Sequence, residues 1–163
     1  MAIDCEITFR KATPEDADFV LDLRTKTLRD LVVRTWGAWD EERQRRYVGQ
    51  ILASEGTRIV QIDSMDAGIL DVEEHERVLH IETIGLLPAF HGRGIGSRLI
   101  RDTCTQAAER LFAVTLTVQR ENRRATTLYE RLGFIVTGET MTSLAMTWMP
   151  SGSTTKSGNA SRS

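Results

Sequence analysis

A short glycine-rich turn between an apolar strand and an amphipathic helix restricts the fold of this chain more than any other feature. Glycines 92, 94 and 96 follow an apolar run that ends at Leu87, and a helical pattern begins at Ile95. Because glycine has no Cβ, the backbone can turn sharply here and come close to a ligand. The first helical turn presents unpaired N–H groups and the positive end of the helix dipole. The sequence therefore predicts a phosphate or pyrophosphate site.

Two common phosphate-binding loops do not fit this turn. A P-loop requires a lysine directly after its glycines, and no lysine follows here. A dinucleotide-binding loop requires a third glycine where this chain has Ser97, and it lies near the start of a βαβ unit rather than past the middle of a chain. A third kind of phosphate loop is needed.

A second motif follows roughly thirty residues after the glycines. Residues 114–118 form a β-branched alternating run, and residues 122–134 then read Asn-x-x-Ala-x-x-Leu-Tyr-x-x-x-Gly-Phe. Asn122 is predicted to cap a helix, and Gly133 to end it in the left-handed conformation. Tyr129 lies beside the apolar face of this helix, which consists of Ala125, Leu128 and Leu132.

The two motifs, in this order, resemble the GCN5-related N-acetyltransferase (GNAT) superfamily over about residues 5–148. The turn is similar to the Gln/Arg-x-x-Gly-x-Gly/Ala loop that binds the pyrophosphate of acetyl-CoA in that superfamily. The resemblance implies an α/β fold (an α+β three-layer sandwich) with a mixed, mostly antiparallel central sheet of about six to seven strands. Helices flank this sheet, and its central strands are splayed. It also implies acetyl transfer from acetyl-CoA to a primary amine of a small molecule, by direct attack in a ternary complex.

The resemblance assigns cofactor binding to the loop and to the strand before it, where the pantetheine arm inserts like an additional strand. No metal is expected. The implicated residues are Ile84, Leu86, His91, Gly92, Arg93, Gly94, Gly96, Ser97, Asn122 and Tyr129. His91 departs from the superfamily pattern, which has Gln or Arg at this position. The backbone role of the loop is independent of that side chain.

Acetyl transfer to an amine needs help at both reacting atoms. A thiolate whose conjugate thiol has a pKa of about 8.5 is a fair leaving group, and the resemblance places Tyr129 beside the sulfur as a proton or hydrogen-bond donor. An alkyl amine with a pKa of about 10 is protonated at neutral pH, so a general base, or a water chain to one, would assist attack.

Glu82 is the favoured base, and His80 is the alternative. Both lie on the predicted strand 78–86. By strand alternation Glu82 shares a face with Ile84 and Leu86, unless a bulge resets the phase. Glu82 could instead bind the acceptor.

Two tryptophans mark the segment between the first two predicted helices. Trp36 and Trp39 flank Gly37 in a polar loop, where they could form the wall of an acceptor pocket with Asp40 or Glu41 facing an ammonium group. The alternative is that they pack the loop onto the domain. The resemblance does not imply a single acceptor for this loop.

Length and composition indicate one domain over residues 1–149 and a disordered tail over residues 150–163, where Ser, Gly and Thr dominate. The formal charge of −2 gives no indication of a nucleic-acid partner. No apolar run is long enough to span a membrane, and no signal-peptide pattern is present. Cys5 and Cys104 are expected as free thiols in a reducing compartment, so a cytoplasmic location is expected.

Alternative functions remain open at this point. The acceptor could be a protein N-terminus or lysine, or the chain could be a non-catalytic acyl-CoA-binding sensor. A third alternative is a partner-binding domain anchored by the two tryptophans. A homodimer is plausible, since members of the superfamily often pair through their late strands.

Particular boundaries are expected for the secondary structure. Strands are predicted at 6–10, 58–62, 68–72, 78–86, 114–118, 134–137 and 142–148, and helices from Thr13–Pro14 onward, at 41–53, at 95–111 and after Asn122. Residues 64–67 are predicted as a hairpin turn, and Leu111 is placed on the apolar face of the helix that begins at Ile95.

Overall fold

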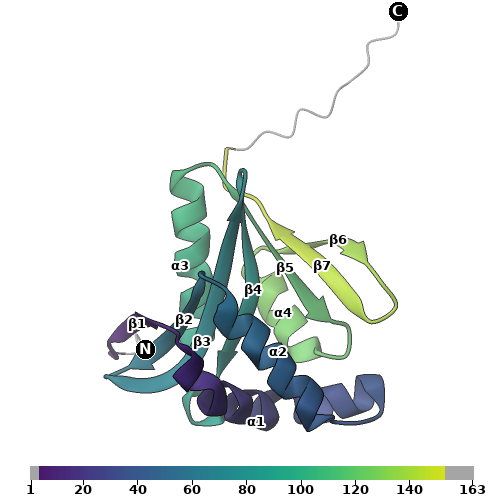
Figure 1. Ribbon diagram of the computed structural model, residues 1–163. Helices are drawn as coiled ribbons and strands as arrows, with labels where there is room; N and C mark the ends of the chain where they lie inside the picture. Colours follow the sequence, from purple (N-terminus) through teal and green to yellow (C-terminus); the bar gives the residue numbers. More distant parts are fainter. Residues whose placement is uncertain (1–3, 153–163) are drawn as a thin grey trace, which may run out of the picture.

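The computed structural model describes residues 4–152, which form a seven-stranded sheet flanked by helices. The strand order is β1-β2-β3-β4-β5-β7-β6, and only β4 and β5 are parallel neighbours (Figure 1). The strands are β1 (Ile7–Lys11), β2 (Thr57–Ile62), β3 (Met65–His75), β4 (Val78–Leu86), β5 (Ala113–Gln119), β6 (Ile135–Glu139) and β7 (Ser143–Trp148). The helices are η1 (Pro14–Asp16), α1 (Ala17–Trp36), α2 (Glu41–Ala53), η2 (Pro88–Phe90), α3 (Ile95–Glu109) and α4 (Arg123–Arg131). The mixed, mostly antiparallel sheet is confirmed; most of the predicted tail, residues 153–163, lies outside the described residues.

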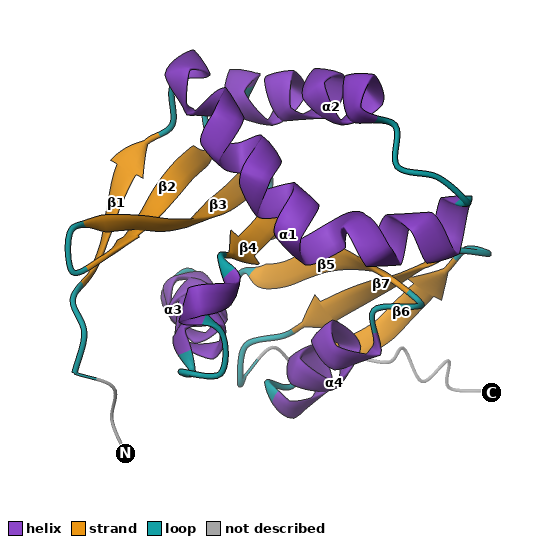
Figure 2. Cartoon of the chain, turned by 90° about the horizontal axis from the view of Figure 1, so that it is seen from below, coloured by secondary structure: helices purple, strands orange, loops and turns teal. Residues whose placement is uncertain are grey.

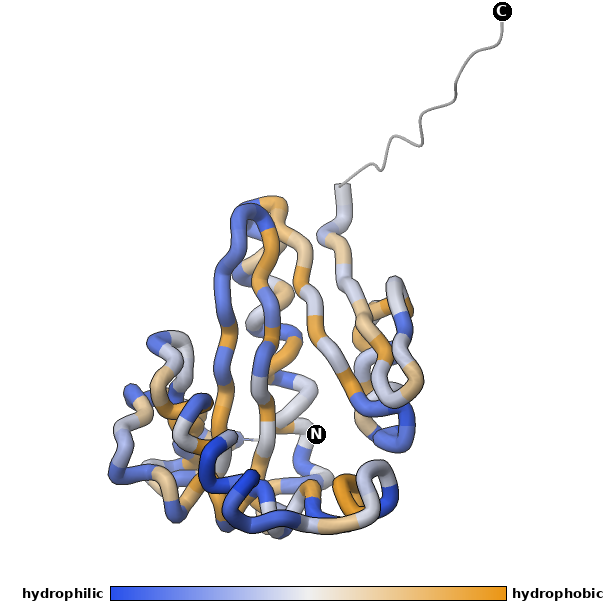
Figure 3. The backbone as a smooth tube through the Cα atoms, turned by 45° about the vertical axis from the view of Figure 1, so that its right-hand side comes forward, coloured by the Kyte–Doolittle hydropathy of each residue, from blue (hydrophilic) through white to orange (hydrophobic). Residues whose placement is uncertain are grey.

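The helices cover both faces of the sheet (Figure 2). Helices α1 and α2 lie on one face, and α3 and α4 on the other. The larger hydrophobic cluster lies on the α3 and α4 side and includes the buried Leu99 and Phe134. The smaller cluster lies under α1 and α2 and includes Leu23 and Ile69. Along the strands, hydrophobic and hydrophilic residues alternate (Figure 3), as a sheet packed differently on its two faces requires.

The helix ends that capping residues predict are confirmed. At the start of α2, Oδ1 of Asp40 accepts a hydrogen bond from the backbone N–H of Arg43, and at the start of α4 Oδ1 of Asn122 accepts one from Ala125. Gly133 follows α4 with φ of +97°, a conformation that glycine adopts readily.

Several boundaries differ from the sequence expectation, and residues with positive φ account for two of these differences. Helix α3 ends at Glu109, and Leu111 adopts a left-handed φ of +57° and is 61% exposed, so it does not belong to the apolar face. The β2–β3 turn consists of Asp63 and Ser64, both with positive φ, rather than residues 64–67. Two successive positive φ values suit a two-residue hairpin turn, which lets β3 start earlier.

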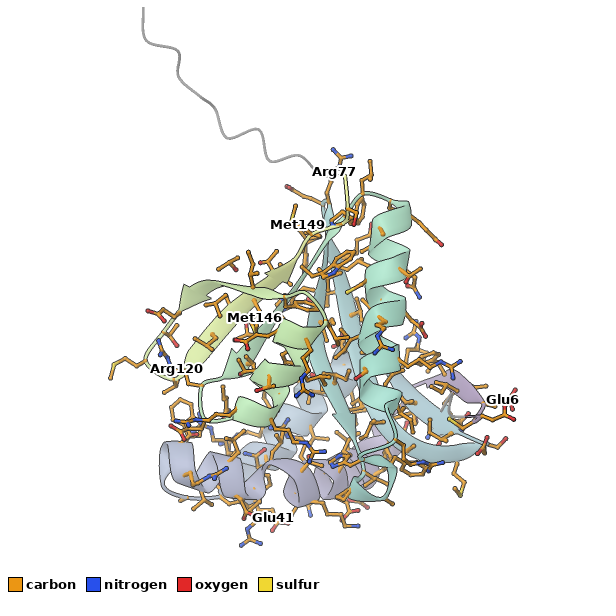
Figure 4. The ribbon with its side chains drawn as sticks, turned by 180° about the vertical axis from the view of Figure 1, so that it is seen from behind. Glu6, Glu41, Arg77, Arg120, Met146 and Met149 are labelled. Carbon is orange, nitrogen blue, oxygen red and sulfur yellow. The ribbon has the colours of Figure 1, made fainter. Side chains whose placement is uncertain are left out.

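Strands β4 and β5 are paired over only part of their length, which confirms the predicted splay. Parallel pairing joins Val78–Ile81 to Ala113–Leu116, and β4 has no partner on β5 beyond that point. The two strands diverge toward α1 (Figure 1). In Figure 4, Arg77 and Met149 lie at the closed end of this gap, and Glu41 lies at the opposite end of the molecule. We call the space between the unpaired parts of β4 and β5 the strand gap.

A β-bulge interrupts β4 beside the strand gap. Thr83 pairs with Asp71 of β3 and Ile81 pairs with Val72, so Glu82 is an extra residue without a partner on β3. A bulge inserts one residue and therefore reverses the alternation of side chains. Of the two alternatives left open by the sequence, the bulge is the one observed, so Glu82 does not share a face with Ile84 and Leu86.

Candidate active site

The glycine loop presents a row of free backbone donors. Gly92 and Gly94 have φ of +71° and +73°, and Gly94 is the N-cap of α3. Within residues 4–152, the backbone N–H groups of residues 92–94 make no hydrogen bond to another backbone group. The next three N–H groups, of residues 95–97, belong to the first turn of α3 and have no helical acceptor. This arrangement can bind a pyrophosphate through backbone groups and the helix dipole.

The side chains of the loop are tied back to the protein. Nε2 of His91 donates a hydrogen bond to the carbonyl oxygen of Leu86 at 2.7 Å, which links the loop to the end of β4. The guanidinium carbon of Arg93 lies 5.8 Å from the centre of the Phe90 ring. The His91 side chain thus occupies one lone pair of the Leu86 carbonyl oxygen, and the second lone pair stays available to a ligand.

The second half of β4 directs backbone groups into the strand gap. Leu87 donates to the carbonyl of Ala67 at 2.8 Å, which makes these two residues a hydrogen-bonded pair of the antiparallel ladder. Hydrogen-bonded and non-hydrogen-bonded pairs alternate along an antiparallel ladder. Leu86 and Ile84 each form a non-hydrogen-bonded pair with their partner on β3. Their N–H and C=O groups therefore point away from β3, toward β5. Both predicted arm-binding residues are suitably placed for that role.

His80 and Glu82 lie together on the face of the sheet that α1 covers. Leu79 and Ile81 belong to the core on the α3 side, so His80 between them points the other way. Nε2 of His80 lies 3.3 Å from Oε2 of Glu82, and its Nδ1 hydrogen-bonds Oγ1 of Thr115 on β5 at 2.7 Å. We call His80 and Glu82 the His–Glu pair. Both predicted base candidates thus form one unit, and their side chains are 26% and 46% exposed, which leaves them open to an acceptor.

Tyr129 lies on the opposite face of the sheet. It is 8% exposed in the larger hydrophobic cluster, with its ring centre 5.9 Å from that of Phe134. Burial raises the pKa of its hydroxyl, because the charged phenolate is poorly solvated there. Within residues 4–152, that hydroxyl makes no hydrogen bond. The His–Glu pair and Tyr129 therefore lie on opposite faces of the sheet in which the strand gap opens.

The two tryptophans are not brought to one cavity. Trp39 lines a cavity of about 460 Å³ between α1 and α2, together with Asp18, Leu21, Asp22, Thr25, Arg29, Glu41 and Arg45. Trp36 ends α1, is 55% exposed and does not line this cavity. The two acids considered for an ammonium group have partners within the chain, since Asp40 caps α2 and Glu41 pairs with Arg45.

Three polar groups near the α1-covered face were missed by sequence reasoning. Oγ1 of Thr35 on α1 and Oε1 of Gln119 on β5 are buried without a hydrogen-bond partner among residues 4–152. Arg24 on α1 is partly buried without a carboxylate partner in the same range. The sequence contained one indication of this environment, because helical spacing places Arg24 on the apolar face of α1.

Among residues 4–152, no group of three or more His, Cys, Asp or Glu side chains is arranged to hold a metal ion. No helix in this range combines the length and apolar character needed to cross a bilayer.

Comparison with known proteins identifies the family. Residues 6–134 match the acetyltransferase (GNAT) family. An uncharacterized N-acetyltransferase of Methanocaldococcus jannaschii is 30% identical over 135 residues, which are 78% of this chain and 60% of that protein. The chain therefore spans 60% of the length of this curated relative.

Solved structures share the fold. The PaiA N-acetyltransferase of Thermoplasma acidophilum, in complex with coenzyme A, superimposes with a TM-score of 0.67 at 17% identity, covering 88% of this chain and 99% of that one. The ribosomal-protein-S18-alanine N-acetyltransferase of Escherichia coli gives 0.66 at 15% identity, covering 93% and 98%. Together with the glycine loop and the splayed sheet, the family match leads to one conclusion: this chain belongs to the GNAT family of acetyltransferases.

Proposed function

We propose that this protein transfers an acetyl group from acetyl-CoA to a primary amine of a small molecule, by direct attack of the amine in a ternary complex. The observation that carries the proposal is the strand gap, with the His–Glu pair on one face of the sheet and Tyr129 on the other. The similar Thermoplasma acidophilum protein was crystallised with coenzyme A, which supports the choice of acyl donor.

Acetyl-CoA is held mainly by backbone groups. The N–H groups of residues 92–97 and the dipole of α3 bind the pyrophosphate, and the backbone of Ile84 and Leu86 bonds the pantetheine arm along the strand gap. This places the thioester toward the closed end of the gap, near Tyr129. Fixing both reactants in one orientation supplies a large part of the rate enhancement.

Residues from the two faces of the sheet assist different steps of the transfer. The amine nitrogen attacks the thioester carbonyl carbon, so a C–N bond forms while the C–S bond breaks. The carboxylate of Glu82 accepts the proton that the amine loses, and His80 holds this carboxylate in place. Burial raises the pKa of Tyr129, so its hydroxyl is protonated at neutral pH and donates its proton to the departing sulfur. Solvent then takes the proton from Glu82 and returns one to the Tyr129 phenolate, which restores the protein. The products are an acetamide and free CoA.

The cysteines favour direct transfer over a covalent enzyme intermediate. Burial raises the pKa of Cys104 to about 12, so its thiol stays protonated and is a poor nucleophile at neutral pH. Cys5 precedes β1, outside the elements that line the strand gap. A ternary complex is the simpler mechanism for these residues.

Release of the CoA thiol from acetyl-CoA tests the proposal. The purified protein is offered amines, amino acids, polyamines, aminoglycosides and short peptides, and release is compared with the rate without acceptor. We expect acceptor-dependent release with a small amine. Release with peptides alone would indicate a protein acceptor, and tight acetyl-CoA binding without any release would indicate a sensor.

A further inference from the structure

Arg24 is a charged side chain on the buried face of α1. Helical spacing places it beside Val20 and Leu31, which are both buried. The preceding residue, Leu23, packs against β4, because a methyl group on Gly85 would meet its Cδ2 at 3.6 Å. Arg24 therefore belongs to the layer that covers the same face of the sheet as the His–Glu pair.

Two contacts fix the guanidinium group and leave part of it free. Its Nε and Nη2 both donate to Oε1 of the buried Gln44 on α2, at 3.2 and 3.0 Å. Its Cζ lies 4.4 Å from the centre of the Tyr47 ring. Nη1 makes no hydrogen bond to residues 4–152. The group is held in one orientation, and both N–H donors of Nη1 and the second N–H of Nη2 stay available.

This arrangement differs from the partly buried arginine that serves a structural role in the same protein. Arg10 donates to both oxygens of Asp16 and also to Asp66, which balances its charge. No carboxylate of residues 4–152 lies within 4.0 Å of the Arg24 guanidinium, and burial lowers the pKa of Arg24. A desolvated cation without a counter-ion is unfavourable, so a purely structural position would favour a carboxylate partner or an apolar residue.

Other unpaired polar atoms belong to the same layer. Oγ1 of Thr35, three helical turns after Arg24 on the same face of α1, is buried without a partner in the described chain. Oε1 of Gln119 is also unpaired, and Gln119 lies on β5 beyond its last pair with β4. Its neighbour Val118 belongs to the core on the α3 side, so Gln119 points toward α1. Unpaired polar atoms between α1 and the sheet are expected where a polar ligand completes the hydrogen bonds.

We propose that Arg24 binds a carboxylate of the acceptor, so that the acceptor carries an amine and a carboxylate on one molecule. This inference rests on the proposed acetyltransferase function. A single guanidinium matches the one negative charge of a carboxylate and can bond it through adjacent N–H donors. Arg24 fixes the carboxylate end, while the amine end lies toward the His–Glu pair.

Matched acceptors test the inference in the full chain. Glycine, β-alanine, γ-aminobutyrate and several apolar α-amino acids are compared with their carboxamides by CoA thiol release. We expect kcat/KM for the best acid to exceed that for its amide by at least about tenfold, mainly through KM. Arg24→Gln should bring this ratio to about one, and Arg24→Lys should retain part of it. Arg43→Gln, at an exposed arginine of α2, should keep the full ratio.

The possible outcomes distinguish the carboxylate-binding role of Arg24 from the acetyltransferase function on which it rests. Equal use of acids and amides by the natural sequence, or an unchanged ratio in Arg24→Gln, overturns the inference and leaves the acetyltransferase proposal intact. A lower melting temperature with an unchanged ratio would assign Arg24 a structural role only. If Arg24→Gln does not fold, the inference is tested by the acid-to-amide ratio of kcat/KM in the natural sequence and in Arg24→Lys: a ratio near one in the natural sequence, or an undiminished ratio in Arg24→Lys, overturns it. Absence of release with every acceptor removes both proposals.

Discussion

Nε2 of His80 lies 3.3 Å from Oε2 of Glu82, two residues further along the same strand. Strand alternation puts both side chains on one face, and the bulge at Glu82 changes the phase only for the residues that follow it. Thr115 of β5 holds the other ring nitrogen of His80, so the pair is anchored one residue before the last β4–β5 pair, Ile81 with Leu116. The His–Glu pair therefore borders the strand gap.

Glu82 and His80 should behave as one functional unit. We expect Glu82→Gln to lower kcat/KM about a hundredfold and His80→Asn about tenfold, because the carboxylate takes the proton and the imidazole only positions it. The kcat/KM of the double variant should be no more than about twofold lower than that of Glu82→Gln alone, because the effects of residues that act together are not additive. Initial rates of CoA release measure this cycle.

The exposed pair of Glu74 and Arg110 provides the control for that cycle. Nη2 of Arg110 lies 2.6 Å from Oε1 of Glu74. Glu74 is paired with Leu79 and so faces the α3 side of the sheet, opposite to His80. Glu74→Gln therefore removes an ionic contact away from the His–Glu pair. Its rate should match the natural sequence. Full additivity between Glu82→Gln and His80→Asn would show that the two side chains act separately.

Tyr129→Phe should reduce kcat while leaving acetyl-CoA affinity within about twofold. We expect a decrease of ten- to a hundredfold, the usual range for loss of a positioned acid. Since burial raises the pKa of Tyr129 above its ordinary value of about 10, the hydroxyl stays protonated at mildly alkaline pH, and its ionisation should not lower the natural rate below about pH 9. Steady-state kinetics from pH 7 to 9 and calorimetric titration measure both effects. An unchanged kcat would exclude Tyr129 as the acid.

Gly92→Ala should weaken acetyl-CoA binding by at least about tenfold through obstruction of the phosphate site. Gly37→Ala is the matched control, because both glycines have positive φ and a Cβ at either would meet no atom within 4 Å. Each change should lower the free energy of unfolding by about 1 kcal/mol through backbone strain. Equal loss of affinity in both variants would remove the loop from the binding site. Urea denaturation and calorimetry separate the two effects.

Arg10→Gln should lower stability at neutral pH by about 1–2 kcal/mol, because it leaves the buried carboxyl of Asp16 without its main partner. The Arg10 hydrogen bond lowers the pKa of Asp16, so this carboxyl stabilises the fold above about pH 4, and the effect is lost as pH falls through its folded-state pKa. The difference between variant and natural sequence should therefore shrink toward pH 2. Urea denaturation at several pH values measures it.

The exposed pair of Arg46 and Glu42 supplies the stability control. Arg46→Gln removes an i,i+4 contact on the outside of α2 and should change stability by no more than about 0.5 kcal/mol. A difference for Arg10→Gln that stays constant down to pH 2 would mean that packing, rather than the Asp16 charge, accounts for its effect.

Elements specified by short-range chemistry were predictable from the sequence. The range 41–53 for α2 is confirmed because Asp40 caps its first turn, and the range 78–86 for β4 is confirmed because its ends are marked by a turn and by Pro88. The end of α3 was not predictable, since Leu111 adopts a positive φ that its residue type gives no reason to expect.

Features that depend on distant partners were beyond the reach of sequence reasoning. The faces of Ile84 and Leu86 relative to Glu82 depend on a bulge in the pairing of β4 with β3, which the sequence indicates only as a possibility. The environment of Arg24 depends on Gln44 and Tyr47, which α2 brings from about twenty residues away. The turn at the glycine loop and the start of α3 were predictable, because the glycines that adopt positive φ lie within the loop itself.

The limited pairing of β4 with β5 divides one strand into two regions with different tolerance to mutation. Over Val78–Ile81 the backbone is bonded on both sides, so replacements there should act on folding yield and melting temperature. From Thr83 onward only β3 is bonded, and the other edge of the strand is the one assigned to the cofactor arm in the proposed function. Within nine consecutive residues, β4 thus separates positions bonded to two strands from positions whose outer edge is open to a ligand.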